Sequence, residues 1–208
     1  MNQPFKIRPS SKRSILFLFS SVFILSCGMG DKDKERIYFE AVKDFDNNKR
    51  SEAKQGFSRI YDDDPEFQDT RMYLGKIAFY DLDFDEAERK FYDAYAERPE
   101  QIDALKWLIK AEFSKKERPM EILKANVQKF LNLCSEDLEV LYIKGILAEE
   151  SKKPDIAILA YRQILAISSK SALAHERMLL ISKRFRDEKG IETHEKALLI
   201  RKQRKKQR

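Results

Sequence analysis

Apolar residues recur at intervals of three and four along most of the chain, a spacing that places them on one face of an α-helix. Ile37, Ala41 and Phe45 follow this spacing, and a second run begins at Ala53. Polar segments rich in Asp, Asn or Pro separate such runs. The strict alternation of apolar and polar residues that is typical of a half-buried strand does not occur. The pattern therefore predicts an all-α protein built from short helices joined by turns.

The helical pattern repeats with a period of 34 residues. Four pairs of residues occupy equivalent places in two successive copies: Ala41 and Gly75, Ala53 and Ala87, Phe57 and Phe91, and Pro65 and Pro99. Small residues let two packed helices approach closely, and proline ends the second helix of each copy. This order predicts a helical hairpin that is repeated along the chain.

The segment from Arg71 to Pro99 resembles the tetratricopeptide repeat (TPR) family at Leu74-Gly75, Phe84, Ala87, Phe91, Ala94 and Pro99. The resemblance implies an all-α fold, a TPR-like right-handed α-solenoid in which each hairpin stacks on the next. Within a repeat domain at 34–200, four hairpins are expected, at 34–67, 68–101, 102–137 and 138–171, followed by a weaker, degenerate pair at 172–200. The third hairpin departs most from the repeat, with a turn expected at Lys115–Arg118 and Pro119 opening its second helix.

Residues 1–26 have the three parts of an export signal. A basic segment ends at Arg13, and an apolar run extends from Ile15 to Leu25, too short to span a bilayer comfortably. The segment from Ile24 to Gly28 resembles the lipobox of bacterial lipoproteins, although Ile24 and Leu25 are bulkier than the usual pair. The resemblance implies a lipoprotein signal peptide that is cleaved before Cys27, and acylation of Cys27, including a palmitate-type chain. A cleaved signal without lipid and an uncleaved anchor remain open as alternatives.

A lipidated Cys27 implies a location in the cell envelope, attached to a bacterial membrane. Residues 27–33 are then expected to form a short polar tether. By the usual sorting rule, Gly28 directly after the lipidated cysteine favours the outer membrane over the inner membrane.

The formal net charge of +6 describes the two ends of the chain more than its body. Residues 1–26 and 196–208 together carry eleven basic residues and no acidic one, which leaves a net charge of −5 for the remainder. This distribution gives no support for a nucleic-acid-binding body. The basic tail at 201–208 is expected to fray as a solvated end, and attraction to an anionic surface is its alternative interpretation.

Residue patterns that carry catalysis were not found. His175 and His194, the only histidines, lie 19 residues apart, and no metal-ligand spacing joins them to each other or to Cys134. Cys134 is expected to be a small buried apolar residue. The sequence therefore predicts a protein that is not an enzyme, with no cofactor, no metal site and no small-molecule substrate.

With no catalytic pattern found, the remaining candidate for function is a protein-binding surface. In the TPR family, the first helices of the hairpins line a concave face that binds a peptide or a helix of another protein. Carried over to this chain, a partner-binding groove would be lined by Tyr38, Val42, Phe45, Met72, Lys76, Phe79, Tyr80, Lys106, Lys110, Phe113 and Tyr142. Lysines between aromatic residues would suit a partner with acidic residues. As an alternative, several of these aromatic side chains pack between neighbouring helices.

These observations predict a membrane-anchored lipoprotein whose repeats bind another protein and scaffold a cell-envelope complex. Its layout resembles that of repeat lipoproteins that help assemble outer-membrane proteins or pili, which implies a role of that kind. The alternative is an envelope enzyme, or an accessory subunit of an enzyme that acts on the cell wall. The missing catalytic residues count against this alternative.

Overall fold

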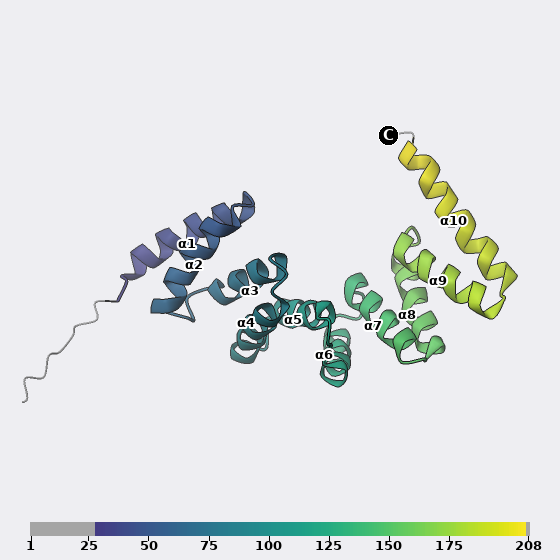
Figure 1. The fold of residues 1–208 in the computed structure, drawn as a ribbon, viewed down its shortest axis with the longest axis horizontal. Coiled ribbons are helices and arrows are strands. Elements are labelled where there is room, and N and C mark those ends of the chain that lie inside the picture. Colours follow the sequence, from purple (N-terminus) through teal and green to yellow (C-terminus); the bar gives the residue numbers. More distant parts are fainter. Residues whose placement is uncertain (1–27, 207–208) are drawn as a thin grey trace, which may run out of the picture.

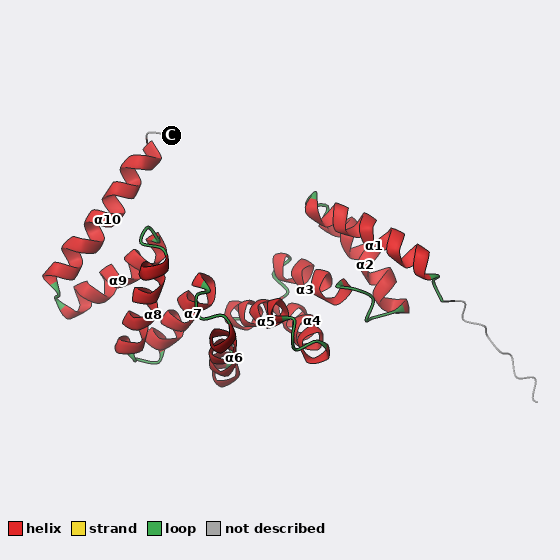
Figure 2. Cartoon of the chain, turned by 180° about the vertical axis from the view of Figure 1, so that it is seen from behind, coloured by secondary structure: helices red, strands yellow, loops and turns green. Residues whose placement is uncertain are grey.

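The computed structural model describes residues 28–206, which form ten α-helices and no strand (Figures 1 and 2). The first six helices are α1 (Asp31–Asp46), α2 (Arg50–Asp63), α3 (Thr70–Tyr80), α4 (Phe84–Glu97), α5 (Ile102–Ser114) and α6 (Met120–Leu133). The last four are α7 (Leu138–Glu150), α8 (Pro154–Ile167), α9 (Ala172–Phe185) and α10 (Glu188–Lys206). The predicted all-α fold class is confirmed.

Consecutive helices pair as hairpins, and the hairpins follow one another along an arc (Figure 1). Each helix packs on the helix before it and on the helix after it. In addition, α3 touches α5, and α5 touches α7. The first helices of the second, third and fourth hairpins therefore lie next to each other on one side of the array.

The residues of the repeat signature build the core. Phe57, Phe91 and Tyr161 occupy equivalent places on α2, α4 and α8, and each is completely shielded from solvent. The alanines four residues before them are equally buried. One apolar cluster fills the first hairpin and its contact with α3, and a larger one extends from α3 to α9. Burial of this apolar surface is the main force that holds successive hairpins together.

Glycines of the first helices make room for these aromatic rings. A Cβ atom on Gly75 would lie 2.7 Å from Cε1 of Phe91, and one on Gly145 would lie 2.4 Å from Cε1 of Tyr161. Carbon atoms in contact are normally about 3.5–4.0 Å apart. The glycine is therefore required because the ring sixteen residues later occupies the place of its side chain.

In four hairpins, the same kind of turn joins the first helix to the second. Asn48, Leu82, Lys152 and Arg186 all adopt a left-handed backbone conformation, with φ between 56° and 64°. In each case, the N–H of the next residue donates to a carbonyl oxygen five residues back, as Asp83 does to Ala78 over 2.9 Å. This pattern is the Schellman ending of a helix. The third hairpin lacks it and instead connects α5 to α6 through a longer segment, residues 115–119.

Three expectations about segment ends need correction. Pro119 is the N-cap residue of α6 rather than its first residue. The basic tail, expected to fray, continues α10 as a helix to Lys206. The predicted tether is shorter, because α1 begins at Asp31 and leaves only residues 28–30 between Cys27 and the first helix. Cys27 itself and the other residues of the predicted signal peptide lie outside the described residues.

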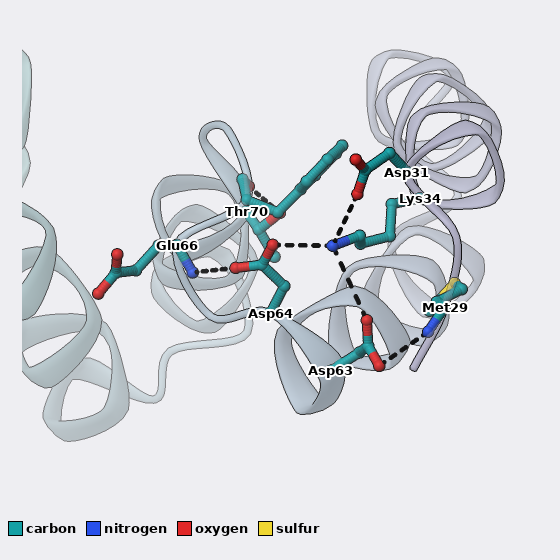
Figure 3. Close-up of polar contacts among 8 residues, drawn as sticks. Met29, Asp31, Lys34, Asp63, Asp64, Glu66 and Thr70 are labelled. Carbon is teal, nitrogen blue, oxygen red and sulfur yellow. Dashed lines mark hydrogen bonds and ion pairs between the residues drawn. The ribbon is translucent and has the colours of Figure 1, made fainter. Parts of the chain in front are cut away.

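Polar contacts fix the start of the described chain to the end of the first hairpin (Figure 3). The backbone N–H of Met29 donates to Oδ1 of Asp63 over 3.0 Å. Lys34 is almost buried, and its Nζ lies 2.9 Å from Asp64 and 3.3 Å from Asp31. The hydrogen bond with Asp64 raises the pKa of Lys34 and lowers that of Asp64. Residues 28–30 are therefore tied to the folded domain rather than acting as a free linker.

None of the helices between residues 28 and 206 is both long enough and apolar enough to cross a membrane.

Candidate protein-binding face

The eleven residues predicted to line a groove all lie on first helices of hairpins, namely α1, α3, α5 and α7. Two of them belong to the core instead of the surface. Tyr38 is 7% exposed and Met72 is 5% exposed. The ring of Tyr38 makes edge-on contacts with Phe57 and Phe67, and desolvation raises its pKa to about 12. For these two residues, packing between helices is the correct interpretation.

A cluster of aromatic and lysine side chains joins α3 to α5, and we call it the aromatic–lysine cluster. It consists of Tyr73, Lys76, Phe79, Tyr80, Trp107 and Lys110. The Nζ atom of Lys110 lies 4.0 Å from the centre of the Trp107 ring, and Tyr80 is 48% exposed. Phe45 of α1 approaches the cluster through Tyr73, with 5.3 Å between ring centres. Val42 is half-buried and packs against the apolar cluster of the first hairpin.

Trp107 was not predicted as part of this face, although the sequence contains a signal for it. Trp107 lies 34 residues after Tyr73, which is one repeat. Tyr73 stacks on Phe57 at 4.7 Å between ring centres, and Trp107 stacks on Phe91 at 5.6 Å. In both cases, an aromatic residue of one hairpin covers the buried phenylalanine of the hairpin before it. Trp107 therefore has a packing role as well as a place on the surface.

The groove lysines of α5 are already paired with carboxylates of the same chain. Nζ of Lys106 lies 2.8 Å from Asp137, and Nζ of Lys110 lies 2.9 Å from Glu139. Desolvation lowers the pKa of Lys106, but the hydrogen bond and charge of Asp137 outweigh it, and the pKa is raised overall. Asp137 also caps α7 by accepting from the N–H groups of Glu139 and Val140. The positive charge of these two lysines, which was expected to attract an acidic partner, is therefore largely neutralised.

An open apolar groove lies beside these ion pairs, between α5, α7 and the start of α9. Its volume is about 470 Å³. We call it the inner groove, and it is lined by Phe79, Lys110, Phe113, Ser114, Leu138, Glu139, Tyr142, Ile143, Ile164, Ser171 and Leu173. Four of these residues, Phe79, Lys110, Phe113 and Tyr142, were predicted from the sequence. Leu138 and Leu173 were missed, and both are exposed at 38% and 56%.

A buried carboxyl group lies inside the third hairpin. Glu112 of α5 is only 2% exposed, and its Oε1 accepts a hydrogen bond of 2.8 Å from Nδ2 of Asn126 on α6. Its other oxygen has no partner among the described residues. Desolvation raises the pKa of Glu112 to about 7, and the hydrogen bond from Asn126 only partly opposes this. Sequence reasoning gave no sign of this group, because charged residues are rarely buried without a partner.

The two histidines meet between α9 and α10. Their Nδ1 atoms are 2.9 Å apart, and Nε2 of His175 lies 3.0 Å from the carbonyl oxygen of Ser169. His194 is 7% exposed, and desolvation together with the charge of His175 lowers its pKa. If His175 donates to Ser169, its Nδ1 is free to accept from Nδ1–H of His194. The hairpin places side by side two residues that the sequence gave no reason to connect.

Metal-binding clusters of three or more His, Cys, Asp or Glu side chains do not occur within residues 28–206. Cys134 is a half-buried free thiol that packs against the larger core.

Stacked helical hairpins with a repeated small-residue and aromatic signature define a TPR-like α-solenoid. No protein-family model matches the sequence, and no curated protein matches it. Several solved structures share the fold. MamA from Desulfovibrio magneticus superposes with a TM-score of 0.74 at 14% identity, over 84% of this chain and 98% of that one. A second MamA structure gives a TM-score of 0.72 at 20% identity, over 84% and 96%. A tetratricopeptide repeat protein from Parabacteroides merdae gives 0.69 at 18% identity, over 82% and 67%. The predicted TPR-like fold is confirmed.

Proposed function

We propose that the protein is a non-catalytic, membrane-anchored lipoprotein whose repeats bind a segment of another protein and scaffold a complex of the bacterial cell envelope. The inner groove is the observation that supports the proposed binding of another protein. It is open, largely apolar and formed mainly by α5 and α7, which are the first helices of successive hairpins. Exposed apolar surface in a concave site is a common mark of a protein-binding surface.

The ion pairs on the edge of the inner groove define the kind of partner segment that fits. Lys110 and Glu139 neutralise each other at 2.9 Å, so the groove presents no strong net charge to a ligand. Phe113, Tyr142 and Leu173 supply apolar contact area instead. The proposed ligand is therefore a segment with one or two large apolar side chains, without the acidic residues that the sequence led us to expect beside them.

Site-specific crosslinking tests the groove. A photo-crosslinking residue placed at Leu173 in the inner groove is expected to form covalent adducts with a partner in living cells, because this side chain is exposed and would lie against the bound segment. The measurement is the appearance of light-dependent adducts on a denaturing gel, followed by identification of the attached protein.

Leu133 provides the matched control, because it is a leucine on α6 that is 64% exposed and outside the groove. The same probe at Leu133 is expected to give none of these adducts. Tyr142→Asp should also remove the adducts formed from position 173, because a charge would enter the apolar groove. Identical adducts from positions 133 and 173 would contradict the assignment of the site.

The anchor is proposed from the lipobox-like segment before Gly28. Cys27 would carry the acyl chains, and the hydrogen bond from Met29 to Asp63 would hold the first hairpin close to the membrane surface. Several acyl chains together give stable attachment, whereas one gives only marginal binding. Gly28 after the cysteine supports the outer membrane as the location.

Cys27→Ala is expected to abolish incorporation of labelled palmitate and to leave an uncleaved precursor, because lipid attachment requires the thiol. The measurement is metabolic labelling combined with the apparent mass of the protein. Cys134→Ala, which removes the chain's other thiol, is the control and should label normally. Palmitate that remains on the Cys27→Ala protein would disprove the anchor.

A further inference from the structure

Helix α10 is the last helix of the array, and no helix among the described residues covers its outer face (Figure 1). It packs on α9, with His194 in contact with His175, and Ile191, His194 and Leu198 along it are buried or half-buried. The outer face includes Lys196, Leu199, Ile200 and Gln203, all of them exposed. This spacing of three, four and seven residues forms a continuous stripe along a helix. Leu199 is 57% exposed and Ile200 is 42% exposed.

The charge of α10 changes abruptly where this stripe begins. The last acidic residue is Glu195, and the segment from Lys196 to Lys206 contains six basic residues and no acidic one. The helix continues through this segment and has 19 residues against 14 in α9. At 1.5 Å per residue, α10 is therefore roughly 7 Å longer than α9. Figure 1 shows α10 running out from the end of the arc.

We propose that the terminal half of α10 is a membrane-contact helix that binds the surface of an anionic phospholipid bilayer. Leu199 and Ile200 enter the boundary between headgroups and acyl chains, and the basic residues after them interact with lipid phosphates. Exposed aliphatic residues beside a run of lysine and arginine combine the two contributions to binding at a membrane surface, which are burial of apolar area and attraction to anionic lipids. Each basic residue near an anionic surface adds to the binding.

The exposed aliphatic residues favour lipid over other anionic partners. Leu199 and Ile200 lie at the start of the basic segment, and a purely electrostatic contact with nucleic acid would not need exposed aliphatic side chains there. The body between residues 27 and 195 carries a net charge of −5, so the attraction is confined to this one end of the array. The inference does not depend on acylation of Cys27, because it concerns the opposite end of the solenoid (Figure 1).

Sedimentation with lipid vesicles tests the proposal on the unlipidated chain of residues 28–208. Vesicles of phosphatidylcholine and phosphatidylglycerol are expected to bind the protein at least about tenfold more tightly than vesicles of phosphatidylcholine alone, and added salt should weaken the binding. Removing residues 201–208 should abolish the difference between the two lipids. The double variant Leu199→Ser with Ile200→Ser should weaken binding to the anionic vesicles about tenfold or more.

Leu180→Ser is the matched control, since Leu180 is an exposed leucine on α9 outside the stripe, at 55% exposure. It should bind like the unchanged protein, and circular dichroism should show the same helix content for every variant. Equal binding to both kinds of vesicle, or unchanged binding after removal of residues 201–208, would overturn the proposal. Unchanged vesicle binding by the double serine variant, together with tighter binding to duplex DNA than to vesicles, would show a general polyanion site and would also overturn it.

Discussion

Gly145→Leu is expected to lower the free energy of unfolding by about 3 kcal/mol, because a side chain at this position collides with the buried ring of Tyr161. Even the Cβ atom would lie 2.4 Å from Cε1 of that ring. The ring has no room to retreat. Tyr161 is fully buried, and its hydroxyl donates to Glu149 over 2.7 Å. Glu149 also accepts two hydrogen bonds from Arg177 of the next hairpin.

Thermal unfolding followed by circular dichroism measures the effect. A loss of this size should lower the melting temperature by roughly 6–12 °C in a chain of this length. Lys144→Leu is the control, because it adds a leucine one residue earlier on the same helix, at a half-buried position. That change should cost less than about 0.5 kcal/mol. Equal losses for both variants would show that Gly145 does not make the close contact.

The glycine contacts show what the repeat period can predict. Gly75 and Gly145 each precede by sixteen residues the ring that occupies the place of their side chain. From the sequence, we expected small residues to let two backbones approach. The structure shows instead that the glycine accommodates an aromatic ring of the partner helix. The period identifies which positions are in contact, but the atoms that meet depend on how the two helices are rotated.

Contacts between hairpins were less predictable than contacts within them. Lys106 and Lys110 form ion pairs with Asp137 and Glu139, respectively, at the start of α7. These ion pairs depend on how the third and fourth hairpins stack, and the third hairpin is the one that departs from the repeat. Changing both lysines to glutamate would place four carboxylates together and destabilise this junction. Such a variant would test stability rather than partner binding.

The burial and contacts of polar side chains that lie outside the repeat pattern could not be predicted from the sequence either. The 34-residue period relates apolar positions, whereas Glu112 and the pair of His175 and His194 are polar groups that occur once. Nothing in their spacing along the chain indicates burial or mutual contact. Their roles follow from the burial and the contacts that the folded hairpins impose on them.

Glu112 leads to the second large effect, a loss of stability as the pH rises. Burial raises the pKa of Glu112 to about 7 in the folded protein, and its ordinary value is 4.5. The folded state therefore holds the proton more tightly than the unfolded state between these two values. Linkage then requires the stability from this proton to be complete below about pH 4.5 and to be lost as the pH rises towards 7.

Glu112→Gln should remove this dependence, because glutamine imitates the protonated acid and can still accept from Asn126. At pH 8, the variant is expected to be more stable than the unchanged protein by about 2–3 kcal/mol, whereas at pH 4.5 the two should be nearly equal. The measurement is urea unfolding at a series of pH values. The quantity to compare is the difference in unfolding free energy between the two proteins.

Taking the difference between the two proteins isolates Glu112 from the histidine pair, which acts in the opposite direction. The pKa of His194 is lowered in the folded protein, so its contribution is present above the ordinary pKa of histidine and is lost as the pH falls. Both proteins contain this pair, and its effect cancels in the difference. Glu121→Gln, which changes an acidic residue with a side chain 89% exposed, is the control and should give a difference close to zero throughout. A Glu112→Gln difference that stays constant from pH 4.5 to pH 8 would mean that the buried carboxyl group is not the origin of the pH dependence.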